Sequence, residues 1–124
     1  MLRVRTLYAC SDAETARYYT RYLDEPDEEP GRWRGGQGEA LGLAGTVDTD
    51  QLETLLAGHD PTSGRQLGSP LADRYKADGT VIKAVAGYDA TFSAPKSLSE
   101  WWALTGDPGL LHAHDVAVAA VLDH

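Results

Sequence analysis

The order of apolar and polar residues predicts a chain of short strands and helices. Leu2–Tyr8 alternates apolar side chains with arginine, which is the period-two pattern of a half-buried strand. A capping box at 11–14 indicates a helix that runs to about residue 23. Asp48 is expected to cap a second helix over 49–57, because a glycine follows its end. The first half of the chain therefore predicts one strand and two helices.

The second half of the chain is predicted to hold a hairpin, a further strand and two helices. Asp78 and Gly79, between two runs with strand character, are typical of a hairpin turn. Pro95 fits the first turn of a helix, and a break at 106–108 separates this helix from the last one. The elements expected here are strands over 74–77, 80–85 and 87–93 and helices over 95–104 and from 109 to the end. We interpret the whole pattern as an α+β fold.

Composition changes this picture through the distribution of charge. The 124 residues carry 11 Lys and Arg against 19 Asp and Glu, a net charge of -8. Taken alone, this value argues against a nucleic-acid-binding protein, because phosphate contacts need basic residues. However, five of the acids fall in the proline-bounded run 24–30, which is predicted to be a solvated loop, whereas residues 1–23 hold four arginines and two acids. The net charge therefore does not describe any one face of the fold.

Length and composition also limit the class of protein. We expect residues 1–124 to form at most one compact domain. The single cysteine excludes an internal disulfide framework and a Cys-rich zinc site. No apolar run approaches the roughly 20 residues of a membrane span, and the arginine-containing start lacks a signal-peptide core. The sequence therefore predicts a soluble, cytoplasmic protein.

A cluster of tyrosines on the first predicted helix is a candidate nucleophile. Tyr18 and Tyr22 share a helix face, while Tyr19 points about 100° away, and Arg17 and Arg21 lie on the same helix. The three rings cannot all be buried on one stripe, so one hydroxyl is expected to reach solvent or a ligand. A phenol can act as a covalent nucleophile. The alternative is that the tyrosines line the edge of a core helix.

The segment 89–97 combines polar groups in an unusual order. A strand ends near Asp89, and Ser93, Lys96 and Ser97 follow at the start of a helix, where backbone N–H groups favour a phosphate. Asp89 could accept or orient a proton. The alternative is an ordinary helix start with a surface lysine. A serine acyl-enzyme, suggested by the S-x-x-K spacing of Ser93 and Lys96, lacks its companion motifs.

His112 and His114 raise the question of a metal site. On a strand, side chains two residues apart point the same way and can share an ion. Here they fall in a segment with helical periodicity, where they lie about 200° apart and do not converge. We therefore interpret them as helix residues and not as metal ligands.

At this point the sequence resembles a known family. Residues 89–99, D-A-T-F-S-A-P-K-S-L-S, are similar to the D-x-T-F-S-A-P-K-S-x-S signature of conjugative relaxases of the TrwC/TraI type, the MobF class. The tyrosine cluster, P-G-R-W at 30–33, L-G-L-A-G-T-V-D at 41–48 and A-H-D at 113–115 occur in the order of that family. The resemblance covers essentially the whole chain.

The resemblance implies an activity and roles for individual residues. Such enzymes cleave one DNA strand at a transfer origin with a tyrosine, stay attached through a 5′-phosphotyrosyl bond and later rejoin the ends. By position, the nucleophile is expected to be Tyr18 or Tyr19, with Tyr22 a candidate second tyrosine. Asp89 matches the acidic residue that acts beside the nucleophile. The residues expected to contact DNA are Arg17, Arg21, Ser93, Lys96 and Ser97.

The resemblance also implies a metal and partners. In the family, Mg²⁺ or Mn²⁺ is held by three histidines, two of them on a strand that follows the helix ending this chain. The resemblance therefore implies an α+β, HUH endonuclease-like relaxase fold, an antiparallel sheet with helices, truncated before the histidine strand and inactive alone. Because no stop signal ends the last helix, we expect the sequence to be cut short. The expected partners are single-stranded origin DNA and, for the full-length protein, the conjugation machinery.

One alternative remains open at this stage. A non-catalytic DNA-binding or partner protein, derived from a truncated relaxase, fits the same motifs. The DNA after codon 124 would distinguish the two hypotheses, since an in-frame histidine strand favours the enzyme and a genuine stop codon favours the binding protein.

Overall fold

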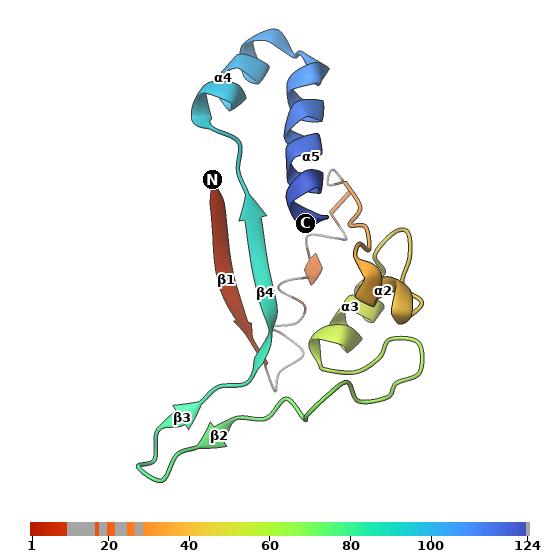
Figure 1. Ribbon diagram of the computed structural model, residues 1–124, viewed down its shortest axis with the longest axis vertical. Helices are drawn as coiled ribbons and strands as arrows, with labels where there is room; N and C mark the ends of the chain where they lie inside the picture. Colours follow the sequence, from red (N-terminus) through yellow and green to blue (C-terminus); the bar gives the residue numbers. More distant parts are fainter. Residues whose placement is uncertain (10–16, 18–19, 22–24, 27–28, 124) are drawn as a thin grey trace. The chain divides into compact units, whose positions relative to one another are not determined.

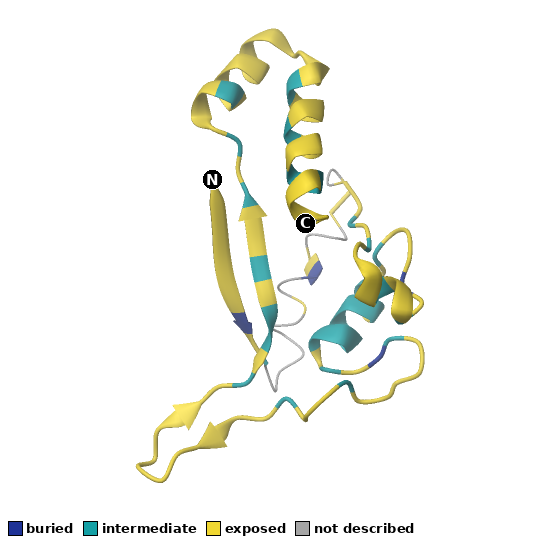
Figure 2. Ribbon diagram, viewed as in Figure 1, coloured by how far each residue is buried: buried dark blue, intermediate teal, exposed yellow. Residues whose placement is uncertain are grey.

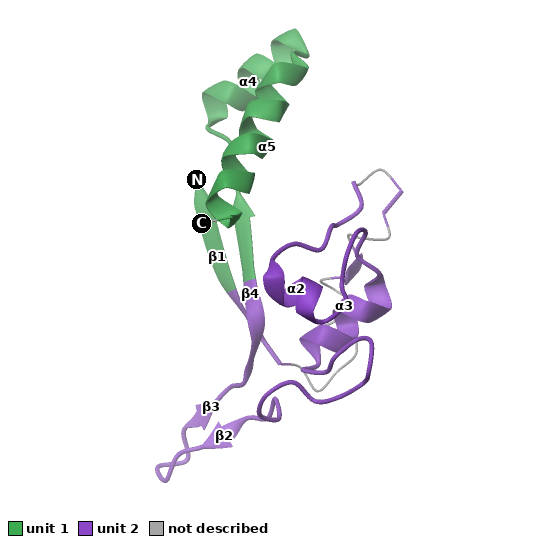
Figure 3. Cartoon of the chain, turned by 45° about the vertical axis from the view of Figure 1, so that its right-hand side comes forward, with its two compact units in different colours: residues 1–5, 89–124 green, residues 6–88 purple. Residues whose placement is uncertain are grey.

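The computed structural model describes residues 1–9, 17, 20–21, 25–26 and 29–123 (Figure 1). Two-stranded sheets and short helices alternate along the chain, which confirms the predicted α+β fold. The chain divides into two compact units (Figure 3). The first consists of Met1–Arg5 and Asp89–His124, and the second consists of Thr6–Tyr88. The elements are β1 (Leu2–Tyr8), α2 (Gly36–Ala40), α3 (Thr49–Leu56), β2 (Arg74–Tyr75), β3 (Val81–Ile82), β4 (Val85–Phe92), α4 (Lys96–Thr105) and α5 (Pro108–Leu122).

Strands β1 and β4 lie side by side, although they are far apart in the sequence (Figure 1). Met1 and Ser93 exchange two hydrogen bonds, of 2.5 Å from the terminal amino group to the Ser93 carbonyl and 2.8 Å from the Ser93 amide. At the other end, the Ala9 amide donates to the Ala84 carbonyl at 2.8 Å. Because the start of one strand meets the end of the other, the pair is antiparallel.

The predicted strand Leu2–Tyr8 is confirmed, but its predicted half-burial is wrong for most positions. Leu2 and Val4 are 54% and 57% exposed, and of the apolar residues in this strand only Leu7 is buried (Figure 2). Alternation decides which side chains share a face, whereas burial needs a second layer against that face. Within the described residues, no element covers Leu2 and Val4.

The predicted hairpin forms around Asp78 and Gly79. Arg74 pairs with Ile82 and Tyr75 with Val81 in antiparallel register. Gly79 has φ +84°, and its amide donates to the Lys76 carbonyl at 3.0 Å, the geometry of a three-residue hairpin loop. The strands β2 and β3 are shorter than predicted and their residues are exposed, because an isolated two-stranded hairpin has no layer to pack against.

Two of the glycine-containing motifs lie next to each other in the structure. The Trp33 amide donates to the Gly45 carbonyl at 2.9 Å, and the Val47 amide donates to the Gly31 carbonyl at 2.8 Å. The segments 31–33 and 45–47 are therefore antiparallel neighbours. Leu43, close to this pairing, is one of the buried hydrophobic residues of the described chain.

Local signals account for both ends of α3. The Asp48 carboxylate accepts a hydrogen bond from the Gln51 amide at 3.1 Å, which confirms the predicted N-cap. At the other end, the Gly58 amide donates to Leu55 and the His59 amide to Thr54, the two bonds of a Schellman motif. Gly58 has φ +85°, a conformation that favours glycine at this position.

Three of the four boundaries predicted for the last two helices are correct within one residue, whereas α5 ends at Leu122 and not at the last residue of the sequence. Pro95 is the N-cap of α4 and not a residue of its first turn, because its ψ of 145° is extended. Asp107 caps α5 by accepting from the Gly109 amide at 2.8 Å, and Pro108 occupies the first helical turn. Neither helix has a buried residue among those described (Figure 2).

A short loop after α3 is organised by one carboxylate. Asp60 is buried, and its two carboxylate oxygens accept bonds from the Ser63 hydroxyl at 2.6 Å, the Thr62 hydroxyl at 2.7 Å and the Thr62 amide at 2.8 Å. These bonds, with that of the Ser63 hydroxyl the strongest, hold the pKa of Asp60 well below its usual range. The ionised carboxylate therefore stabilises the loop.

We expect this stabilisation to depend on pH in one direction. Because the folded pKa is depressed, the contribution is complete above the unfolded pKa of about 4 and is lost only as the pH falls through the lower folded value. The NMR shift of the Asp60 carboxyl carbon should thus stay flat through pH 4, where free aspartate titrates. In Asp60→Asn, the amide shifts of Thr62 and Ser63 should lose their acid dependence. An ordinary titration of Asp60 near pH 4 would contradict the prediction.

Candidate functional site

The side chain of Asp89 lies in an open pocket on one face of the β1–β4 pair. The pocket has a volume of about 490 Å³. Alternate residues at the start of β1 and at the end of β4 contribute to it, as expected when alternate side chains share a sheet face. Its lining residues, all within one compact unit, are Met1, Arg3, Arg5, Asp89, Thr91 and Ser93.

The pocket has an excess of positive charge. Among its lining residues, Arg3 and Arg5 have positively charged side chains and Asp89 has the one negatively charged side chain. Across the described parts of the chain, neither Arg3 nor Arg5 takes part in an ion pair, and Asp89 has none either. This face can therefore accept an anion, although the chain as a whole carries a net charge of -8.

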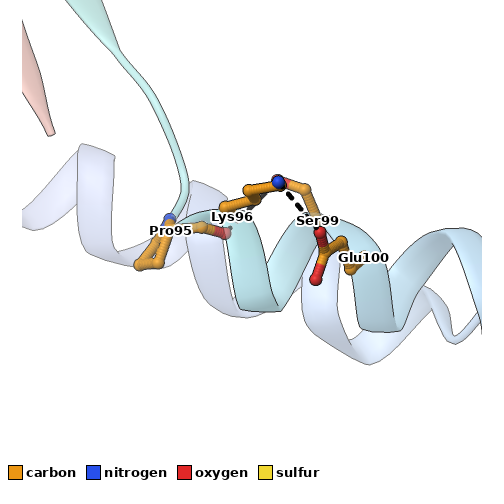
Figure 4. A network of polar contacts seen from close by, with 4 residues as sticks. All are labelled: Pro95, Lys96, Ser99 and Glu100. Carbon is orange, nitrogen blue, oxygen red and sulfur yellow. Dashed lines mark hydrogen bonds and ion pairs between the residues drawn. The ribbon is translucent and has the colours of Figure 1, made fainter.

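The start of α4 does not gather the polar groups that the sequence suggested. Lys96 forms an ion pair with Glu100, Nζ to Oε1 at 3.4 Å, with both side chains exposed (Figure 4). Ser93 belongs to the Asp89 pocket, whereas Lys96 and Ser97 are not among the residues that line it. The ion pair between Lys96 and Glu100 is exposed to solvent and therefore adds little stability. The DNA contacts assigned to Lys96 and Ser97 stay predictions.

The tyrosine helix is only partly described. Tyr18, Tyr19 and Tyr22 lie outside the described residues, while Arg17 and Thr20 are helical, as predicted. Thr20 is 2% exposed and its hydroxyl donates to the Glu53 carboxylate of α3 at 3.0 Å. This contact joins the segment to α3, and no sequence pattern indicated it. Arg17 and Arg21 are exposed, so their predicted DNA contacts are sterically open.

The two histidines near the C-terminus lie where helical periodicity predicted them. His112 and His114 are in α5, which confirms the helical interpretation. His114 lines an apolar pocket of about 210 Å³ with residues such as Trp102 and Leu111. Residues 1–9, 17, 20–21, 25–26 and 29–123 contain no group of three His, Cys, Asp or Glu side chains placed to hold a metal ion.

None of the described helices combines the length and the apolar character that crossing a bilayer requires.

Sequence reasoning missed Arg3 and Arg5 as site residues. The alternation of Leu2, Arg3, Val4 and Arg5 showed that the two arginines share a face, but not what that face meets. Only the pairing of β1 with β4 places them beside Asp89.

Comparison with known proteins identifies the fold. The family model for TrwC relaxase matches residues 4–124. The chain is 42% identical over 87 residues to the multifunctional conjugation protein TraI of Escherichia coli, a match that covers 70% of this chain and 4% of that protein. The TraI of E. coli strain K12 is 41% identical over 87 residues, with the same coverage.

Solved structures agree with the family match. The metal-free structure of the conjugative relaxase TrwC in complex with OriT DNA superposes with a TM-score of 0.72 at 33% identity, over 98% of this chain and 39% of that one. For the metal-bound structure of TrwC with OriT DNA the values are 0.73 and 31%, with the same coverage. The chain thus spans about 39% of the solved TrwC chains and 4% of TraI.

The fold is that of a conjugative relaxase over the part that the chain covers. The chain belongs to the TrwC relaxase family. The resemblance drawn from the 89–99 signature is therefore confirmed, as is the α+β relaxase fold.

Proposed function

We propose that this chain forms part of a conjugative relaxase that nicks and rejoins one DNA strand at a plasmid transfer origin through a 5′-phosphotyrosyl intermediate. The observation that carries the proposal is the position of Asp89. This residue of the family signature lies in an open pocket with two arginines and without an ion-pair partner among the described residues. We further propose that the full-length protein acts in the cytoplasm together with the conjugation machinery.

The reaction proposed here is a transesterification. The hydroxyl oxygen of Tyr18 or Tyr19 forms a bond to phosphorus, the bond from phosphorus to the 3′ oxygen breaks, and the phenolic proton is balanced by the proton that the leaving 3′ hydroxyl gains. Asp89 accepts or orients the phenolic proton. Attack by a 3′ hydroxyl reverses the sequence and rejoins the strand. Tyr22 is the candidate for a second transfer.

The proposed reaction also involves a divalent metal ion, but the described residues do not provide its ligands. A bound divalent ion such as Mg²⁺ or Mn²⁺ supplies charge compensation at the non-bridging phosphate oxygens. The described residues do not fit such an ion, because no three potential ligands converge among them. The roles proposed for Tyr18, Tyr19 and Asp89 therefore include no metal contact, and we propose that the 124 residues alone do not cleave DNA.

A chimera tests the proposed function. In it, residues 1–124 replace the matching segment of the TrwC relaxase, whose structures cover 98% of this chain. We expect the chimera to nick a supercoiled plasmid that carries the TrwC OriT and to remain on the 5′ end. Asp89→Asn should lower the cleavage rate by roughly 10²–10⁴-fold, the usual contribution of an acid–base group.

The matched control is Asp50→Asn, which removes an exposed carboxylate of α3 and should leave the rate unchanged. A folded chimera that binds OriT DNA without cutting it would contradict the enzymatic proposal and favour the non-catalytic DNA-binding protein. Cleavage by the isolated chain would contradict the statement that the 124 residues are inactive alone.

A further inference from the structure

The proposed tyrosine reaction leaves part of the Asp89 pocket without a role. Arg3 and Arg5 line the pocket from β1, and both side chains are exposed. The ion pair that the described residues contain joins Lys96 to Glu100 and involves neither arginine. Among the described residues, two positive charges on this face thus have no acidic partner within ion-pair distance.

The spacing of the two arginines favours an extended anion. Alternate residues of a strand lie about 7 Å apart along its axis, so their guanidinium groups form a row and not a single point. Each guanidinium presents a planar fork of N–H donors that matches a phosphate in bidentate fashion. A row of two such forks suits successive phosphates of one polymer chain better than a single small anion.

The remaining lining groups support the same ligand. Thr91 and Ser93 add hydroxyl groups on the same face, and hydroxyl donors are common partners of phosphate and sugar oxygens. Asp89 adds the one negative charge, which disfavours a compact and highly charged anion beside it. The pocket, with a volume of about 490 Å³, is large enough for a short stretch of one backbone.

We propose that Arg3 and Arg5 form a phosphate track that binds the backbone of single-stranded DNA and positions it along β1 beside Asp89. This inference rests on the proposed relaxase function and adds two positioning residues to it. Contacts to phosphates carry no base information, so the contribution of the track to binding is expected to be independent of sequence.

A binding experiment tests the phosphate track. The chain is titrated into a fluorescein-labelled single-stranded oligonucleotide in the cold, and fluorescence anisotropy reports its affinity at several salt concentrations. R3A/R5A is compared with R34A/R65A, which removes two exposed arginines of the other compact unit and the same amount of charge. We expect R3A/R5A to weaken binding by about tenfold or more and to reduce the salt slope by about 1.4, since each phosphate contact on a single strand contributes about 0.7. The control should change the slope by less than half of this.

A second variant separates charge from geometry. R3K/R5K keeps both charges but loses the bidentate fork, so the salt slope should remain while the affinity falls several-fold. Circular dichroism of each variant checks that the fold is retained, and the exposed positions of both arginines make this the expected result.

The outcomes separate this inference from the proposed function. Equal losses in R3A/R5A and R34A/R65A, or no binding by the unmodified chain, would overturn the track while leaving cleavage by the chimera as an independent result. An equal loss on the matching duplex would overturn the assignment to single-stranded DNA. An inactive chimera together with a loss specific to R3A/R5A would contradict the proposed reaction and not the phosphate track.

Discussion

Changing Tyr18 and Tyr19 together to phenylalanine should abolish covalent attachment of the TrwC chimera to OriT DNA. The substitution removes only the two hydroxyl oxygens, so no phenol of this pair remains to form the bond to phosphorus. Binding should persist, because the aromatic rings are retained. The measurement is the amount of protein–DNA adduct that survives denaturation on a gel, with an oligonucleotide that spans the OriT cleavage site.

Single variants then show which of the two tyrosines carries out the first cleavage. We expect one of Tyr18→Phe and Tyr19→Phe to lose the first cleavage and the other to retain it. Tyr75→Phe is the control, since Tyr75 is 76% exposed on the β2–β3 hairpin and has no role in the proposed reaction. Adduct formation by the Tyr18 and Tyr19 double variant would exclude both as the nucleophile and direct attention to Tyr22.

The second large effect concerns the stability of the isolated chain. Among the described apolar residues, only Leu7 and Leu43 are buried, and α3, α4 and α5 contain no buried residue. Burial of apolar surface is the main favourable contribution to folding. The free energy of unfolding should therefore lie below the range of about 5–15 kcal/mol that is usual for native domains.

Urea titration of the isolated chain tests this prediction, with circular dichroism as the measure of unfolding. We expect a broad transition with a small dependence on denaturant, because little apolar surface becomes newly exposed. A dye that binds exposed apolar surface should bind the folded chain, since Trp101 and Leu104 are 63% and 87% exposed. A sharp cooperative transition at high urea would contradict the prediction.

The sequence predicted those features whose causes lie within a few residues. Asp48 was expected at a helix start because its carboxylate can reach an amide two or three residues ahead, and it accepts from the Gln51 amide. The break expected at 106–108 likewise lies at the start of α5, where Asp107 accepts from the Gly109 amide. Gly79 was expected in a turn, and its φ of +84° shows the conformation that glycine adopts without steric cost. The 89–99 signature also identified the family, which the TrwC relaxase match confirms.

Boundaries and burial were less well predicted where they depend on neighbours. The strands around Asp78 and Gly79 are shorter than expected, because the hairpin packs against no second layer among the described residues. Leu2 and Val4 are exposed for the same reason, although their alternation with arginine is that of a half-buried strand. The roles of Tyr18 and Tyr19 remain predictions from the family resemblance.

The sequence by itself determined the order of the elements, the caps and turns that bound them, and the presence of Asp89 in a relaxase signature. Only the tertiary structure decided that β1 pairs with β4, and with it that Arg3 and Arg5 share a pocket with Asp89. The contact between Thr20 and Glu53 is of the same kind. The physical reason is that caps and turns are closed by bonds within one local segment, whereas strand pairing joins backbone groups that any distant strand could satisfy.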